Sequence, residues 1–227
     1  SAKPKDKNNA KFLYYFLKHI DLNQWAGGSS HPLVTQSLLN SLEFSICINP
    51  NVQRSIASTL SGLDDKIDLL HRQNKTLEKI AETLFRQWFI VEAKEEWEKV
   101  ELGKIADIKA GGDKPKIYSR IKTETCNIPI YSNGIDNVGL YGYTNTAKIN
   151  IESITISARG TIGCVCLRQE PYVPIVRLIA IIPNENYISS KYLYLWAKSQ
   201  NISGTGTTQQ QLTVPDFSRT TLILPPF

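Results

Sequence analysis

The sequence predicts an α+β fold, in which an irregular mixed-sheet domain is attached to one long coiled-coil helix. Three observations predict it. Apolar residues recur at steps of three and four between Val52 and Trp88, short β-rich runs separated by polar loops follow Trp97, and a segment near the N-terminus is repeated near the C-terminus. A chain of 227 residues, 41% of them hydrophobic, has room for one large domain or for two small domains and a linker.

The first fifty residues predict a helix followed by less regular elements. The segment KFLYYFLK, Lys11–Lys18, has the pattern of an aromatic-rich amphipathic helix. Two glycines, two serines and Pro32 then break the chain. Residues 33–40 mix polar and apolar side chains, and Glu43–Ile48 alternates between them as a half-buried strand does.

The long helix is the strongest local prediction. Asn49 is a good N-cap and Pro50 suits the first helical position. The apolar stripe that follows has the a/d spacing of a coiled coil, which requires a second helix to cover it. We call it the seam: Leu60, Leu63, Ile67, Leu70, Asn74, Leu77, Ala81, Leu84 and Trp88.

Asn74 is the one polar residue of the seam, and a buried Asn at an a position fixes register and partner at some cost in stability. At 1.5 Å per residue the helix has a length of roughly 55 Å, too long for the core helix of a small domain. Two interpretations remain open: a helix that pairs with another long helix, and a surface helix packed on its own domain.

The remainder of the chain reads as short strands joined by long polar loops. A lysine-containing turn at residues 110–116 and a Gly/Asn/Tyr-rich loop at residues 132–143 separate the β-rich runs. The region begins at Val100–Ile105, and the runs are Ile128–Tyr131, Ser153–Ser157, Thr161–Leu167, Tyr172–Ile182 and Thr221–Leu224.

An internal repeat links the two ends of the chain. KYLYLWAK, Lys191–Lys198, matches KFLYYFLK at a separation of 180 residues, and both are followed by glycines, a polar segment, a strand-like run and proline. A repeat of this period predicts a first domain before residue 1 and a second long helix after Phe227. Chance similarity between two amphipathic helices is the alternative.

The motifs of the chain do not support catalysis. Leu224-Pro225-Pro226-Phe227 lacks the Asp or Asn that opens the corresponding amino-methyltransferase motif, and no glycine-rich phosphate loop follows a strand. The four cysteines form no CxxC pair and the three histidines are scattered, so we expect neither a zinc site nor a disulfide framework. The chain has no apolar stretch of membrane-spanning length and no signal-peptide pattern, which indicates a cytoplasmic protein.

The loops instead favour DNA. The net charge of +5 is mildly basic, and basic, amide and phenol groups gather between residues 109 and 145. Lysine neutralises phosphate, whereas Arg, Asn and Gln can fork onto bases in the major groove. The candidates are Lys109, Lys114, Lys116, Arg120, Asn133, Asn137, Tyr141, Tyr143, Arg159, Gln209 and Gln210. Each of these could also be an ordinary solvated loop residue.

The whole pattern resembles the specificity subunit of type I restriction-modification enzymes. The motif Leu60–Ile67 and the segment Thr83–Phe89 resemble the central conserved helix of that family. Trp97 with Leu102-Gly103 resembles the start of a target recognition domain, and the Gly111-Gly112-x-x-Pro115 loop follows it. The turn Arg159–Gly163 and the closing Leu224-Pro225-Pro226 also match.

The resemblance implies a layout and a set of partners. Residues 1–50 are expected to be the end of a first target recognition domain, residues 51–90 the spacer helix, and residues 91–227 a second target recognition domain. Such subunits bind double-stranded DNA through two domains, each reading half of a bipartite site, and have no catalytic activity or cofactor of their own. They dock methyltransferase subunits that use S-adenosylmethionine and, through them, ATP- and magnesium-dependent restriction subunits.

Only part of that layout falls within this sequence, so we expect the uncovered seam to pair with a second copy in a homodimer. A different class of function stays open: a coiled-coil dimeric protein-interaction scaffold without DNA specificity. Binding to duplex DNA separates the two.

Overall fold

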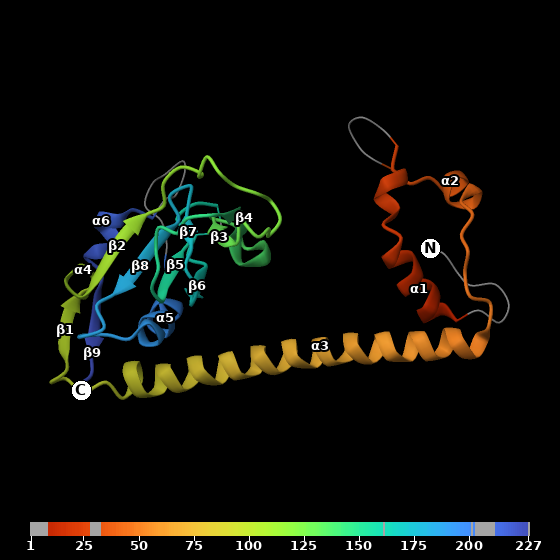
Figure 1. Ribbon diagram of the computed structural model, residues 1–227. Helices are drawn as coiled ribbons and strands as arrows, with labels where there is room; N and C mark the ends of the chain where they lie inside the picture. The colour runs from red at the N-terminus through yellow and green to blue at the C-terminus, as the bar shows by residue number, and fades with distance from the viewer. Residues whose placement is uncertain (1–8, 28–32, 161, 201, 203–211, 227) are drawn as a thin grey trace. The chain divides into compact units, whose positions relative to one another are not determined.

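A computed structural model describes residues 9–27, 33–160, 162–200, 202 and 212–226 (Figure 1). The chain divides into two compact units, Ser1–Leu77 and Glu78–Phe227, which we call the N-terminal and C-terminal units. In this described part of the chain, no helix combines the length and the apolar composition that crossing a bilayer requires.

The N-terminal unit is helical. Helix α1 (Ala10–His19) begins after Asn9, whose side chain caps the backbone N–H of Phe12. It packs on the start of the long helix α3 (Pro50–Arg86): the N–H of Asn9 donates to Gln53 Oε1 at 2.8 Å, and the hydroxyl of Tyr15 donates to Asp64 Oδ2 at 2.7 Å. A 3₁₀ turn (Leu22–Trp25) and the short helix α2 (Gln36–Ser41) complete the unit.

The strand predicted at Glu43–Ile48 is wrong. The segment forms no strand, although alternate side chains from Leu42 to Ile46 are partly buried. A strand needs a hydrogen-bonded neighbour, and no pairing of this segment occurs in the part of the chain that the structure describes.

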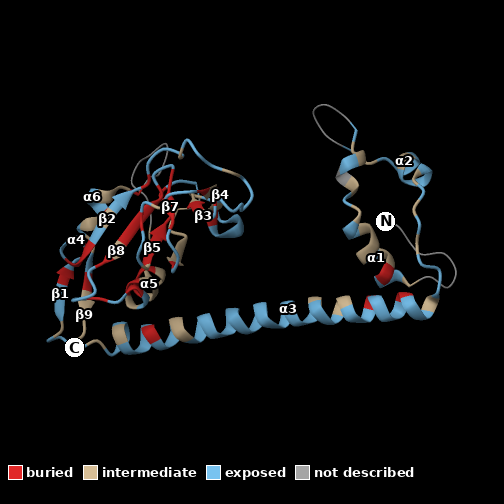
Figure 2. Ribbon diagram, in the orientation of Figure 1, coloured by how far each residue is buried: buried red, intermediate tan, exposed pale blue. Residues whose placement is uncertain are grey.

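The long helix is confirmed. It begins at Pro50, where the Oδ1 of Asn49 accepts the N–H of Asn51 at 2.9 Å, and it continues past Arg86 into a π-helical turn (Gln87–Val91). Its central residues from Lys66 to Ile80 are all exposed, as the pale blue stretch of Figure 2 shows. The seam is therefore uncovered within the described chain; Leu63 and Leu77 are 59% and 63% exposed.

The described residues of the C-terminal unit form three sheets. A two-stranded sheet pairs β1 (Glu98–Glu101) with β9 (Thr221–Leu224). A four-stranded sheet has the order β2 (Ala106–Ala110), β8 (Ile179–Pro183), β5 (Ser153–Ile156) and β6 (Val165–Arg168). A three-stranded sheet has the order β4 (Leu140–Thr144), β3 (Ile128–Tyr131) and β7 (Val173–Pro174).

The core lies between the four-stranded sheet and the helices. Strands β5 and β8 are almost wholly buried (Figure 2). Helix α5 (Ser190–Ser199) packs on β5, β6 and β8 through Leu193 and Trp196, while α4 (Leu102–Ile105) and α6 (Val214–Ser218) lie against each other and β2. Phe85, near the end of α3, enters the same core.

The predicted strands at Ile128–Tyr131 and Thr221–Leu224 are confirmed as β3 and β9. The run Tyr172–Ile182 is not one strand, because it divides between β7 and β8 in different sheets. The division falls at Val176 and Arg177, whose φ angles of 52° and 59° are left-handed and end a strand.

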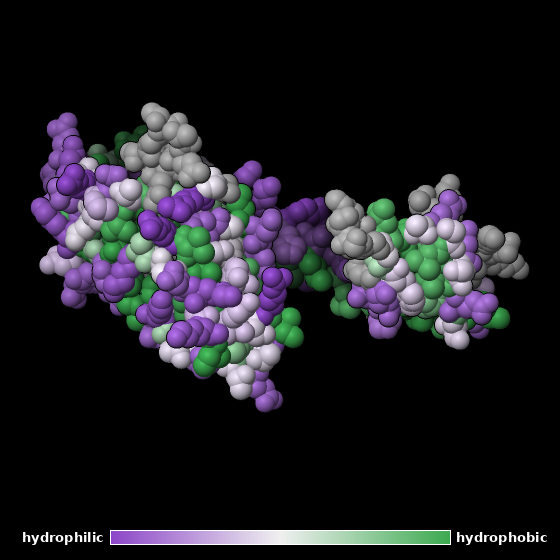
Figure 3. Space-filling model, turned by 90° about the horizontal axis from the view of Figure 1, so that it is seen from above, coloured by the Kyte–Doolittle hydropathy of each residue, from purple (hydrophilic) through white to green (hydrophobic). Residues whose placement is uncertain are grey.

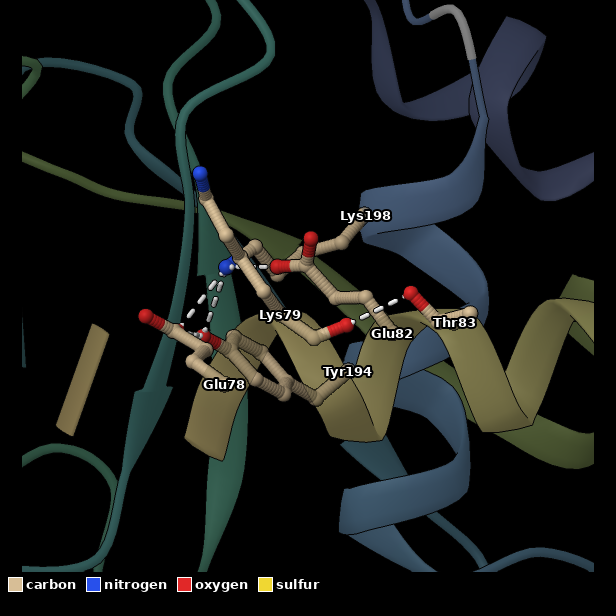
Figure 4. A network of polar contacts seen from close by, with 6 residues as sticks. All are labelled: Glu78, Lys79, Glu82, Thr83, Tyr194 and Lys198. Carbon is tan, nitrogen blue, oxygen red and sulfur yellow. Dashed lines mark hydrogen bonds and ion pairs between the residues drawn. The ribbon is translucent and has the colours of Figure 1, made fainter. Parts of the chain in front are cut away.

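A polar network joins the end of α3 to α5 (Figure 4). Lys198 Nζ lies 2.8 Å from Glu78 Oε1 and 2.6 Å from Glu82 Oε1, and the hydroxyl of Tyr194 also donates to Glu78. Hydrogen bonds from Lys198 and Tyr194 lower the pKa of Glu78. Burial opposes the charge of Lys198, but the two glutamates outweigh it and raise its pKa.

Loss of this network has a predictable cost. Lys198→Met is expected to lower the free energy of unfolding of the C-terminal unit by about 1 kcal/mol, since the pairs are partly exposed and screened. The control is Lys79→Met, next to Glu78 in α3. Lys79 forms no ion pair in the described structure, and its ammonium points away from the carboxylates in Figure 4. Equal losses in urea unfolding of the two variants would contradict the prediction.

The same network sets a pH dependence. Because the pKa of Glu78 is lowered from its usual 4.5, its contribution is present above about pH 4.5 and is lost as the pH falls through the folded pKa. Because the pKa of Lys198 is raised, its contribution is lost only at strongly alkaline pH. The difference in stability between wild type and Lys198→Met should therefore shrink in acid.

Candidate nucleic-acid interface

The basic loop at residues 112–122 is pinned to the edge of the three-stranded sheet. Ser119 and Tyr143 exchange two backbone hydrogen bonds of 2.8 Å, and Thr144 Oγ1 donates to the carbonyl of Ile117 at 2.7 Å. The approach requires glycine at 142 in β4, because a Cβ there would lie 2.6 Å from the Ser119 carbonyl oxygen. A loop with many charges is thus held in a defined place beside β4.

This attachment brings together three exposed side chains, Lys114, Tyr118 and Tyr141, which we call the tyrosine–lysine patch. The Lys114 Nζ lies 3.7 Å from the centroid of the Tyr118 ring, and the rings of Tyr118 and Tyr141 are 6.2 Å apart. The ammonium of Lys114 and, more weakly, the charge of Arg120 lower the pKa of the Tyr118 hydroxyl. A cation over exposed phenols suits both phosphate and the faces of bases.

A second basic side chain, Lys148, lies beside the Gly111-Gly112 turn. The carbonyls of Gly111 and Gly112 accept the backbone N–H groups of Arg177 and Val176, each at 2.9 Å. A Cβ at Gly112 would lie 3.2 Å from Lys148 Nζ, so this ammonium is next to the turn. In the view from above, hydrophilic side chains surround scattered apolar areas on the C-terminal unit (Figure 3).

Several predicted DNA-contact residues are at least partly exposed. Lys116 and Arg120 are exposed on the loop that carries Lys114, and Asn137 is exposed in a left-handed turn with φ 48°. Tyr143 is half-buried beside Ser119. Arg159 is exposed in the β5–β6 loop before Gly160, whose φ is +68°. Gln209 and Gln210 lie outside the described residues.

Two predicted contacts have other roles in the structure. The Nδ2 of Asn133 donates to the carbonyl of Val176 at 2.6 Å, and its Oδ1 accepts the N–H of Ala158 at 2.8 Å. Its amide therefore fastens loops together and is not free to fork onto a base. Lys109 forms an ion pair of 2.6 Å with Asp107 on the same strand, which reduces the charge it offers to phosphate.

Three residues of this surface were not among the DNA contacts predicted from the sequence: Tyr118, Lys148 and Arg177. Tyr118 had a signal in the sequence, because Lys114, Lys116, Tyr118 and Arg120 alternate along one segment and interleave an aromatic group with cations. Lys148 and Arg177 had none, since only folding brings them beside the Gly111-Gly112 turn. Over the described residues, no group of three His, Cys, Asp or Glu side chains is placed to hold a metal ion.

Two proteins described as type I specificity subunits are similar to half or more of this chain. A protein of Mycoplasma pneumoniae described as a type I specificity subunit is 28% identical over 228 residues, which cover 96% of this chain and 60% of that protein. The specificity subunit of the type I restriction enzyme MjaIX from Methanocaldococcus jannaschii is 32% identical over 147 residues, or 56% of this chain and 33% of the relative. This chain thus spans at most 60% of either relative.

The fold is similar to a solved one. The crystal structure of the S subunit of a type I restriction-modification system from M. genitalium matches 96% of this chain and 61% of its own, with a TM-score of 0.58 at 22% identity. The family described as the type I restriction modification DNA specificity domain matches residues 1–79 and 94–227. This match takes in both units, and the chain therefore belongs to the family of type I restriction-modification DNA specificity domains.

Proposed function

We propose that the C-terminal unit reads one half of a bipartite DNA site and that the chain is a non-catalytic part of a restriction-modification system. The tyrosine–lysine patch is the observation that carries the proposal, because it places a cation and two exposed phenols on one rigid surface. Lys116, Arg120 and Lys148 extend the positive charge around it. We assign phosphate contacts to these cations and base contacts to Asn137 and Arg159.

The partners follow from the same proposal. The exposed seam of α3 is covered by a second long helix, in this chain by a second copy, and the helix docks methyltransferase subunits and through them restriction subunits. S-adenosylmethionine, ATP and magnesium belong to those partners, and the chain itself uses no cofactor. A chain that reads duplex DNA together with such subunits works in the cytoplasm.

Salt dependence tests the phosphate contacts. A triple variant, Lys114→Gln with Lys116→Gln and Arg120→Gln, should weaken binding to all duplexes and reduce the slope of log K against log salt by about 1 for each phosphate that is no longer neutralised. Fluorescence anisotropy with a labelled random duplex at several salt concentrations measures this slope. Lys104→Gln, an exposed lysine on α4, is the control and should leave the slope nearly unchanged.

A slope that is the same in the triple variant and in Lys104→Gln would contradict the phosphate assignment.

The exposed seam favours one other function, a coiled-coil dimeric interaction scaffold without DNA specificity. Wild-type binding that is too weak to measure even in low salt, with the helix paired in solution, would favour the scaffold.

A further inference from the structure

Arg168 is a buried cation with no acidic partner in the described chain. It ends β6 and is 5% exposed. Its Nε donates to Thr155 Oγ1 at 2.9 Å, its Nη2 donates to the carbonyl of Val138 at 2.8 Å, and its guanidinium carbon lies 3.6 Å from the centroid of the Tyr131 ring. Burying a charge without an opposite charge is costly, so the contacts that Arg168 makes must compensate for that cost.

These contacts connect elements that are separate in the fold. Thr155 is in β5 of the four-stranded sheet, whereas Tyr131 is in β3 of the three-stranded sheet. Val138 is in the loop between β3 and β4, which we call the β3–β4 loop (residues 132–139). A guanidinium suits this position because it is planar, donates in several directions and stacks on an aromatic ring.

The β3–β4 loop is strained where Arg168 holds it. Asn137 and Val138 have φ angles of 48° and 50°, and Val138 is 54% exposed. The left-handed region is unfavourable for a β-branched residue, which is found there only when its surroundings enforce it. Two hydrogen bonds hold Val138 in this conformation: its N–H donates to the carbonyl of Ile135 at 3.0 Å within the loop, and its carbonyl accepts from Arg168, which ties the loop to the four-stranded sheet.

The rest of the loop is fixed as well. Its first residue, Ser132, donates its N–H to the carbonyl of Gly139 at 2.8 Å. Gly139 has φ +80°, and a Cβ there would lie 2.5 Å from the Ser132 carbonyl oxygen. Asn133 ties the loop to Ala158 and Val176. All these contacts use the backbone or Asn133, and the described structure shows no hydrogen bond of the exposed Asn137 side chain.

We propose that Arg168 is a positioning residue for DNA recognition: it holds the β3–β4 loop in one conformation, and this conformation presents the amide of Asn137 to a base edge. The inference rests on the proposed DNA-reading function. An amide can fork onto adenine in the major groove. A loop ordered before binding avoids the loss of conformational freedom that a flexible loop would suffer on binding.

Selection from a randomised duplex library tests the proposal, using the intact chain and its Asn137→Ala, Arg168→Met and Arg168→Lys variants. Wild type should enrich one sequence. Asn137→Ala should lower discrimination at one base pair roughly 5-fold to 150-fold. Arg168→Met should lower it at the same base pair, with affinity for unrelated duplex unchanged, and Arg168→Lys should recover part of the loss. Arg219→Met, which removes an exposed arginine after α6, is the matched control.

The possible outcomes distinguish a failure of the DNA-reading function from a failure of the positioning role of Arg168. A wild type that enriches no sequence overturns the DNA-reading function itself. A wild type that enriches a sequence, with discrimination at the Asn137-dependent base pair retained in Arg168→Met, overturns only the positioning role. Circular dichroism and thermal unfolding show whether Arg168→Met folds. If it does not, Arg168→Lys decides, because one ammonium cannot replace the two directed donors that the guanidinium offers to Thr155 and the Val138 carbonyl; full discrimination in that variant overturns the proposal.

Discussion

Gly111→Ala is expected to destabilise the C-terminal unit by about 3 kcal/mol or more. A Cβ at Gly111 would lie 2.7 Å from the carbonyl carbon of Pro174 and 2.8 Å from the nitrogen of Ile175. Both atoms are backbone, in or next to a strand held between β3 and the Gly111-Gly112 turn. Relief of the clash requires that strand to move, which pulls the buried side chains of Val173 and Ile175 away from Ile130.

The adjacent glycine provides the control. In Gly112→Ala the nearest atom to the new Cβ is Lys148 Nζ at 3.2 Å, the end of a flexible side chain on the surface. This variant should lose less than about 1 kcal/mol, in the range of ordinary surface changes. Urea unfolding followed by tryptophan fluorescence compares the two. Similar midpoints for Gly111→Ala and Gly112→Ala would show that the strand does not approach the turn as closely as described.

Phe85→Ala is expected to cost about 3–5 kcal/mol of the stability of the C-terminal unit. Phe85 is 4% exposed, and its ring centroid lies 5.0 Å from that of Tyr192 and 5.1 Å from that of Phe89. It is the buried side chain by which the end of α3 joins the core around α5. Truncation removes aromatic contacts from both helices and leaves a cavity between them.

Leu84→Ala is the matched variant one residue earlier. Leu84 belongs to the seam and is 40% exposed, so the unfolding of the C-terminal unit should change little. If a second copy covers the seam, the same substitution should raise the dissociation constant of the dimer at least about 10-fold, which sedimentation velocity over a dilution series measures. A wild-type chain that is monomeric at every concentration would contradict the homodimer.

The long helix was predictable because its determinants are local. Asn49 and Pro50 define its start, and the a/d spacing of the seam needs nothing beyond the neighbouring turns. Strand β3 and the two repeated helices α1 and α5 were found for the same reason. The family resemblance rested chiefly on motifs of the long helix and on short turn motifs, which are local as well, and the fold class was therefore predicted correctly although much of the sheet was not.

The remaining features depend on partners distant in sequence. Glu43–Ile48 has the alternation of a strand, but a strand forms only when another is beside it. Asn133 could read a base or fasten a loop, and only the nearby Ala158 and Val176 decide between these roles. Arg168 comes directly after the predicted run Thr161–Leu167 and was not singled out, because neither its burial nor its hydrogen bond to Val138 leaves a pattern in the sequence.

The pairing of β1 with β9 has a consequence for how such a chain evolves. These strands are the first and last of the C-terminal unit, and Glu98 lies opposite Leu224 in their register. The chain thus enters the sheets of this unit and returns to the same place, so the segment bounded by β1 and β9 is suited to exchange as one cassette. A new cassette that keeps the pairing of β1 with β9 keeps the same connection to the preceding helix, whatever loops it contains.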